Sequence, residues 1–154
     1  MEWITQIKII GQVLLAMVLG GVIGLEREIS VKPAGLRTHM LVAGVAALLI
    51  KLGDLLVIYF NHDVSSDILR SDPIRVIQAI VLGISFLGAG TIIRHGASER
   101  IEGLTTAASI LISATVGICI GINQYIIAVS VAVLTFLVLY LLRPVEKFLH
   151  HNKQ

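Results

Sequence analysis

Charged residues are scarce in this sequence: Asp, Glu, Lys and Arg make up 14% of its 154 residues, whereas a soluble domain averages about 25%. The chain also has one cysteine and three prolines, and aromatic residues account for only 5%. Too little charge argues against a water-soluble globule, a disordered chain and a nucleic-acid-binding protein. The single cysteine excludes a disulfide scaffold.

Apolar residues are abundant instead, at 56% of the chain, with a mean hydropathy of +0.91. They occur in long runs without Asp, Glu, Lys or Arg, and the longest run, from Gly103 to Leu142, is about twice the length of one membrane span. A strand isolated in lipid would leave its backbone unpaired, so these runs predict helices. We therefore expect an all-α membrane protein, a compact bundle of about five transmembrane helices near 7–25, 38–59, 74–94, 103–121 and 124–143.

The sequence predicts a single transmembrane domain over residues 1–154, with a turn at Gly121–Gln124 that folds the longest run back on itself. The first apolar run lacks a convincing cleavage site and is expected to be a retained helix. With five spans, eight Lys and Arg residues lie on one side and three on the other. This excess predicts an N-terminus outside and a cytoplasmic C-terminus, with the basic tail resting on anionic headgroups.

Small residues predict how the helices pack, because apolar surface alone does not pair helices in lipid, whereas small side chains let backbones approach closely. They recur every four residues in the first and fourth expected spans and cluster at residues 88–90 of the third, so we expect these three spans at the centre and the fifth at the periphery. The stripes of small residues on the first and fourth spans also predict a homo-oligomer. The expected packing residues are Gly20, Gly24, Gly83, Gly88, Gly90, Ser109, Ser113, Gly117 and Gly121.

Polar residues at the ends of the first four spans converge on the predicted cytoplasmic face. Two of these spans begin there, and helix N-termini favour an anion or a carboxylate. The hypothesis is a polar cluster that acts either as a structural lock between helix ends or as a site for a small anion or a partner's acidic group. Its members are Glu26, Arg27, Arg37, Thr38, Arg94, Thr105 and Thr106.

On the predicted outer side, Asp72 precedes Pro73, and Asp72 and Arg75 are spaced to form an ion pair on one helical turn. The alternative is an acidic mouth for a cation, formed by Asp72 together with Asp63 and Asp67. Lys51 and Asp54 are also three residues apart, and we expect them to pair with each other rather than to form a proton relay.

Catalytic and metal-binding patterns are not found in the sequence. None of the histidines has metal-ligand spacing with another histidine or with Cys119, which is expected to be a small buried side chain. There is no nucleophile elbow, phosphate-binding loop or pair of catalytic carboxylates. We therefore expect no enzymatic activity, no metal and no cofactor.

Four segments resemble, in this order, those of the MgtC/SapB family of bacterial inner-membrane proteins. They are Gly20–Glu28, Pro33–Val42, Phe86–Ile92 and Gly103–Ser109. The resemblance extends over about residues 10–140 and implies a multi-pass inner-membrane protein linked to growth at low magnesium. The resemblance also implies a regulatory role, because the best-known member of the family looks like a regulator that acts on the ATP synthase. Other membrane proteins are therefore candidate partners.

Two departures from the family pattern are apparent. Many members continue into a soluble C-terminal domain, which we expect to be absent here, and Ser85 stands where the family commonly has glycine. We expect a non-enzymatic regulator in magnesium adaptation that acts through contacts with membrane proteins. The alternative is a transporter or channel for Mg²⁺, protons or a small solute, which would need a polar site near the middle of the membrane.

Overall fold

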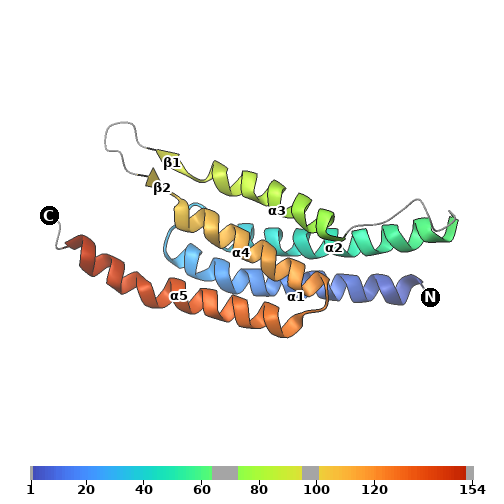
Figure 1. Ribbon diagram of the computed structural model, residues 1–154. Helices are drawn as coiled ribbons and strands as arrows, with labels where there is room; N and C mark the ends of the chain where they lie inside the picture. The colour runs from blue at the N-terminus through green and yellow to red at the C-terminus, as the bar shows by residue number, and fades with distance from the viewer. Residues whose placement is uncertain (1, 64–72, 95–100, 152–154) are drawn as a thin grey trace.

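A computed structural model describes residues 2–63, 73–94 and 101–151 and shows a bundle of long helices (Figure 1). The all-α membrane fold is thereby confirmed. Four helices are long and apolar enough to cross a membrane, within residues 3–29, 36–59, 104–121 and 125–143, while the apolar helix at 74–90 is shorter. The elements are α1 (Glu2–Ile29), α2 (Leu36–Asp63), α3 (Pro73–Gly90), β1 (Ile93–Arg94), β2 (Ile101–Glu102), α4 (Leu104–Gly121) and α5 (Tyr125–His151).

The helices lie lengthwise beside one another, and the two termini are at opposite ends of the bundle (Figure 1). Termini at opposite ends are what a chain shows when its helices pass along the bundle an odd number of times. The predicted turn is confirmed, since α4 ends at Gly121 and α5 begins at Tyr125. Asn123 adopts a φ of 63° within it, a conformation that asparagine accepts more readily than most residues.

The third helix is shorter than the predicted span 74–94. It ends at Gly90, and Ile93 and Arg94 pair instead with Glu102 and Ile101 in a two-residue antiparallel ladder. Thr91 closes the helix by donating its hydroxyl to the Gly88 carbonyl at 2.7 Å, in a glycine-rich segment that is a poor helix former.

The helix at the centre of the bundle is α2 rather than α3, which corrects the expected arrangement. It packs most extensively against α1 and α4, whereas α3 packs on α4 and less extensively on α2. Ala43, Ala46 and Ala47 give α2 a face of small side chains that is completely buried. Because alanines allow as close an approach as glycines do, this face receives both neighbouring helices.

Glycines of α1 and α4 make the closest of these contacts. A Cβ added at Gly20 would collide with the His39 carbonyl of α2, and one at Gly117 would collide with the Ala43 carbonyl. Gly24 and Gly121 also face α2, and Gly88 contacts α4.

Gly83 and Gly90 differ from the expected packing role. A Cβ at either residue would meet open space among the described residues. The reason is that α3 turns the face containing Ile80, Ile84 and Gly88 toward the bundle, and these three residues are buried.

Candidate functional site: a buried polar network

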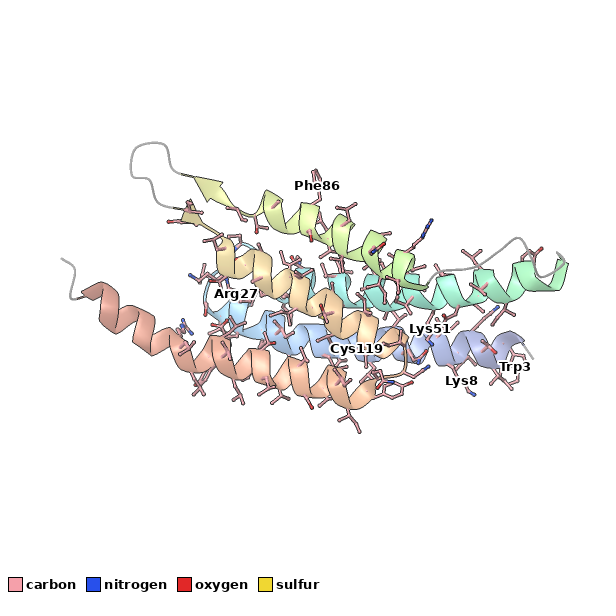
Figure 2. The ribbon with its side chains drawn as sticks, in the orientation of Figure 1. Trp3, Lys8, Arg27, Lys51, Phe86 and Cys119 are labelled. Atoms are coloured by element: carbon pink, nitrogen blue, oxygen red, sulfur yellow. The ribbon has the colours of Figure 1, made fainter. Side chains whose placement is uncertain are left out.

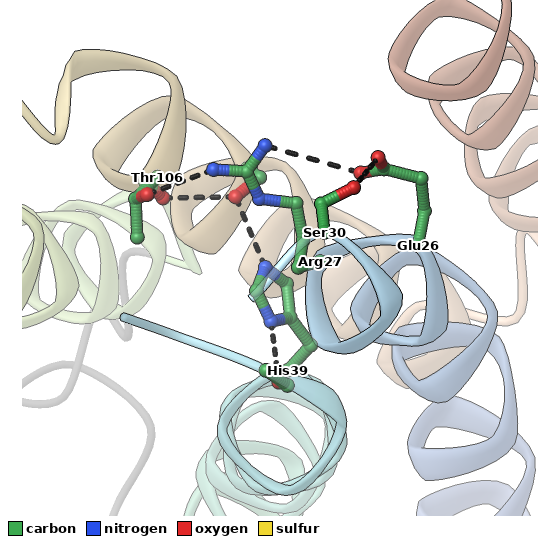
Figure 3. A network of polar contacts seen from close by, with 7 residues as sticks. Glu26, Arg27, Ser30, His39 and Thr106 are labelled. Carbon is green, nitrogen blue, oxygen red and sulfur yellow. Dashed lines mark hydrogen bonds and ion pairs between the residues drawn. The ribbon is translucent and has the colours of Figure 1, made fainter. Parts of the chain in front are cut away.

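A polar network joins the end of α1 and the beginning of α2 to the beginning of α4 (Figure 3). At its centre is Arg27 of α1, whose side chain is almost completely buried, with a relative exposure of 4%. One guanidinium nitrogen, Nη2, donates a hydrogen bond of 2.8 Å to the hydroxyl of Thr106 on α4. A charge at a buried position is costly unless it is bonded, so this contact holds α1 and α4 at a defined distance.

His39 connects α2 to the same part of α4. Its side chain is fully buried, with Nδ1 2.8 Å from the Gly35 carbonyl and Nε2 3.0 Å from the Ser109 hydroxyl. A carbonyl only accepts, so Nδ1 carries a proton. Ser109 has one hydroxyl proton, which it gives either to His39 Nε2 or to the Thr106 carbonyl 2.9 Å away. When Ser109 donates to the Thr106 carbonyl, Nε2 keeps its bond to Ser109 only if it also carries a proton, so the two arrangements differ by one proton on His39.

Glu26 provides the acidic group of the network. Its carboxylate is buried and accepts a hydrogen bond of 2.5 Å from Ser30, one turn later in α1. The second oxygen, Oε2, lies 3.9 Å from the guanidinium of Arg27 and has no hydrogen-bond partner in the part of the chain that the structure describes. Adjacent residues of a helix point in different directions, so this ion pair is long. The contact between Glu26 and Arg27 is therefore not a tight bidentate ion pair.

The N-terminus of α2 is capped from α1, which the sequence analysis did not predict. Glu28 accepts a hydrogen bond of 2.9 Å from the backbone N–H of Leu36, and a carboxylate stabilises the positive end of a helix. A Cβ at Gly35 would collide with this carboxylate in its capping position, so the glycine leaves room for the cap where the chain enters α2.

Of the predicted cluster, three residues meet in this network: Glu26, Arg27 and Thr106. Arg37, Thr38 and Thr105 are exposed, and neither threonine caps its helix by a hydrogen bond that the structure shows. Arg94 lies in β1, and its side chain is outside the described part.

Ser30, His39 and Ser109 belong to the network but were missing from the predicted cluster. The sequence predicts only a packing role for Ser109, and it gives His39 no partner at metal-ligand spacing. One signal for His39 was available: it lies four residues after Gly35, a distance at which a side chain reaches back over the first helical turn.

The opposite end of the bundle has its own polar contacts. Gln12 of α1 donates from Nε2 to Asn123 at 2.6 Å and to the Tyr125 hydroxyl at 2.7 Å, fixing the turn between α4 and α5. Lys51 and Asp54 pair at 3.5 Å, which confirms the expected ion pair. Arg75 lies in the first turn of α3, but Asp72, Asp67 and the predicted Asp72–Arg75 pair fall outside the described residues, so the acidic mouth stays a prediction.

One further polar side chain of α4, Ser113, is fully buried, and its hydroxyl has no hydrogen-bond partner among the described residues. Among the described residues, no group of three or more His, Cys, Asp or Glu side chains is arranged to hold a metal ion. The arrangement can therefore be described chemically as a hydrogen-bonded cross-link between three helices.

Most of this sequence is similar to known proteins. The profile of the MgtC family matches residues 13–148. The chain belongs to the MgtC family. It is 42% identical to Protein MgtC of Brucella abortus over 134 residues, 87% of this chain and 51% of that protein. It is 38% identical to the putative magnesium transporter YhiD of Escherichia coli over 131 residues, 83% of this chain and 57% of that protein.

A protein of Haemophilus influenzae is 39% identical over 146 residues, which is 95% of this chain and 60% of the relative. The chain therefore spans between half and three fifths of the length of these relatives. No solved structure matches it. Together with the apolar helices, family membership makes this a multi-pass membrane protein.

Proposed function

We propose that the protein is a non-enzymatic regulator of the bacterial inner membrane that functions in adaptation to low magnesium. The magnesium link rests on relatives named MgtC and putative magnesium transporter YhiD. The observation that carries the regulator assignment is the hydrogen bond between Arg27 and Thr106. It engages an almost completely buried charge in a contact between helices of this chain, which favours the lock over the ligand site.

Contacts with other proteins would use the outward faces of the bundle. Leu82 and Phe86 of α3 are 74% and 82% exposed, and Ile126 of α5 is 84% exposed; Figure 2 shows Phe86 pointing away from the other helices. A rigid core with apolar helices outside presents fixed surfaces to lipid, to a second copy or to partners such as the ATP synthase. The network would keep these surfaces in register.

The transporter alternative draws its support from the name of the Escherichia coli relative and from Ser113. A buried hydroxyl without a partner in the middle of α4 could contribute to a polar path. The two functions are distinguished by reconstitution of the purified chain into liposomes that contain a Mg²⁺-sensitive dye. A regulator leaves the internal Mg²⁺ constant under a gradient, and protein-dependent Mg²⁺ entry would overturn the proposal.

The role in magnesium adaptation is tested in cells. A deletion strain should grow more slowly than its parent at low magnesium and equally well at high magnesium, and the wild-type chain should restore growth. The Arg27→Gln variant should restore it poorly, whereas Arg37→Gln, which removes an exposed arginine, should restore it fully. Equal growth of deletion strain and parent at low magnesium would contradict the magnesium role.

A further inference from the structure

A groove lies at the end of the bundle where α4 turns into α5, far from the polar network. It has a volume of about 530 Å³ and is walled by α1, α2 and the turn. Figure 2 shows Lys8 and Lys51 at this end. Gln12, Asn123 and Tyr125 line it and are joined by hydrogen bonds to one another. The groove therefore has a polar wall that is already ordered.

The charges and donors along the groove favour an anion. Lys8 and Lys51 contribute two ammonium groups, against a single carboxylate from Asp54. Asp54 pairs with Lys51, whereas Lys8 makes no hydrogen bond or ion pair with a described residue. The Asn123 carbonyl oxygen already accepts two hydrogen bonds, from Gln12 and Tyr125. Its amide nitrogen remains a donor, so the groove has an excess of positive charge and of N–H groups.

Apart from Thr5, the rest of the lining is apolar. Ile9 and Leu15 of α1 and Leu55 and Ile58 of α2 lie along the same groove, and Ile58 is 59% exposed. A cavity for a free phosphate needs neither this apolar area nor this volume. A molecule with an anionic head and a hydrocarbon body satisfies both parts of the lining.

The level of the groove in the membrane agrees with such a ligand. Residues 122–124 connect two helices and are exposed, and exposed irregular backbone does not occur in the hydrocarbon region. The turn therefore marks the boundary between hydrocarbon and headgroups, and lysine stems can extend along apolar surface to place their charges there. We propose that this groove binds an anionic phospholipid, with its phosphate near Lys8, Lys51 and Asn123 and an acyl chain that extends from there along Leu15 into the hydrocarbon region.

The experiment measures lipid retention by native mass spectrometry of the full chain released from detergent. Phosphatidylglycerol, phosphatidylcholine and diacylglycerol are added at equal concentrations, and phosphatidylglycerol should be retained best. A basic residue near the membrane surface changes binding of anionic lipid about five-fold, so Lys8→Gln and Lys51→Gln should each lower phosphatidylglycerol retention by about that factor. Asp54→Asn, which removes the carboxylate, should leave retention unchanged or raise it.

The matched control is Lys32→Gln, which removes an exposed lysine between α1 and α2 at the other end of the bundle and should leave retention unchanged. Circular dichroism checks that each variant folds, and Lys8, with its exposed side chain, is the substitution least able to disturb the bundle. Equal losses in Lys8→Gln and Lys32→Gln, or equal retention of diacylglycerol, would overturn the proposal. Displacement of the lipid by equimolar glycerol 3-phosphate would overturn it too, since the site would then be one for a soluble phosphate.

Discussion

Arg27 of α1 and Thr106 of α4 are 79 residues apart in the sequence and are joined by a hydrogen bond of 2.8 Å. Both side chains are buried. This contact places the end of the first helix beside the beginning of the fourth, and the bond from His39 to Ser109 places the second helix there too. Segments that the sequence separates widely therefore form one end of the bundle.

Thr106→Val tests this contact with little change of side-chain volume. The substitution leaves a buried guanidinium without one acceptor, and hydrogen bonds to charged groups contribute about 1.5–3 kcal/mol. We expect the free energy of unfolding in detergent to fall by about that amount. Thr105→Val, at the exposed neighbouring position, should change it by no more than about 0.5 kcal/mol. Equal effects of the two valines would show that the Arg27 contact does not stabilise the fold.

The bond between His39 and Ser109 is tested by a double-mutant cycle with His39→Ala and Ser109→Ala. Residues that share a hydrogen bond have interaction energies of about 0.5–3 kcal/mol, whereas distant pairs add within about 0.5 kcal/mol. We expect an interaction energy in the range of about 0.5–3 kcal/mol for His39 and Ser109. The control cycle combines His39→Ala with Ser130→Ala, on the exposed surface of α5, and its effects should be additive. Thermal unfolding of the four chains of each cycle provides the measurement. Additive effects in both cycles would refute a coupling between α2 and α4 through this bond.

Two glycine-to-alanine substitutions should have opposite effects. Gly117→Ala pushes a methyl group against the Ala43 carbonyl of α2, and overpacking costs about 1–3 kcal/mol. Gly83→Ala adds a methyl group to open space in a helix, where it should stabilise by about 0.4–1 kcal/mol. Unfolding temperatures of the two variants give the comparison. A stabilising Gly117→Ala would mean that α2 and α4 do not approach as closely as described.

The orientation predicted from the basic residues is tested by cysteine labelling in a Cys119→Ala background. Cysteines placed at the exposed positions 37 and 105 should react with a membrane-impermeant maleimide from the cytoplasmic side. A cysteine at position 123 should react from the outside, because the turn lies at the opposite end of the bundle from α2's first residue (Figure 1). Labelling of 37 and 105 from different sides would contradict both the orientation and the five-pass arrangement.

The sequence by itself determined the membrane class, the helices and the turn at Gly121–Gln124. An uninterrupted apolar run predicts a membrane helix because the free energy of its transfer into lipid depends only on the residues of that segment. The pairing of Lys51 with Asp54 was accessible for the same reason, since the two residues share one helical turn.

Only the tertiary structure decided which helix is central and which side chains form the network. Arg27 and Arg37 are both arginines near helix ends, and only the rotation of each helix about its axis buries one and exposes the other. The same rotation places His39 inside the bundle and Gly83 outside it. The rotation of a helix about its axis is set by its packing against several neighbours, as where the alanine face of α2 contacts two helices at once. The spacing of residues along a single segment therefore does not determine that rotation.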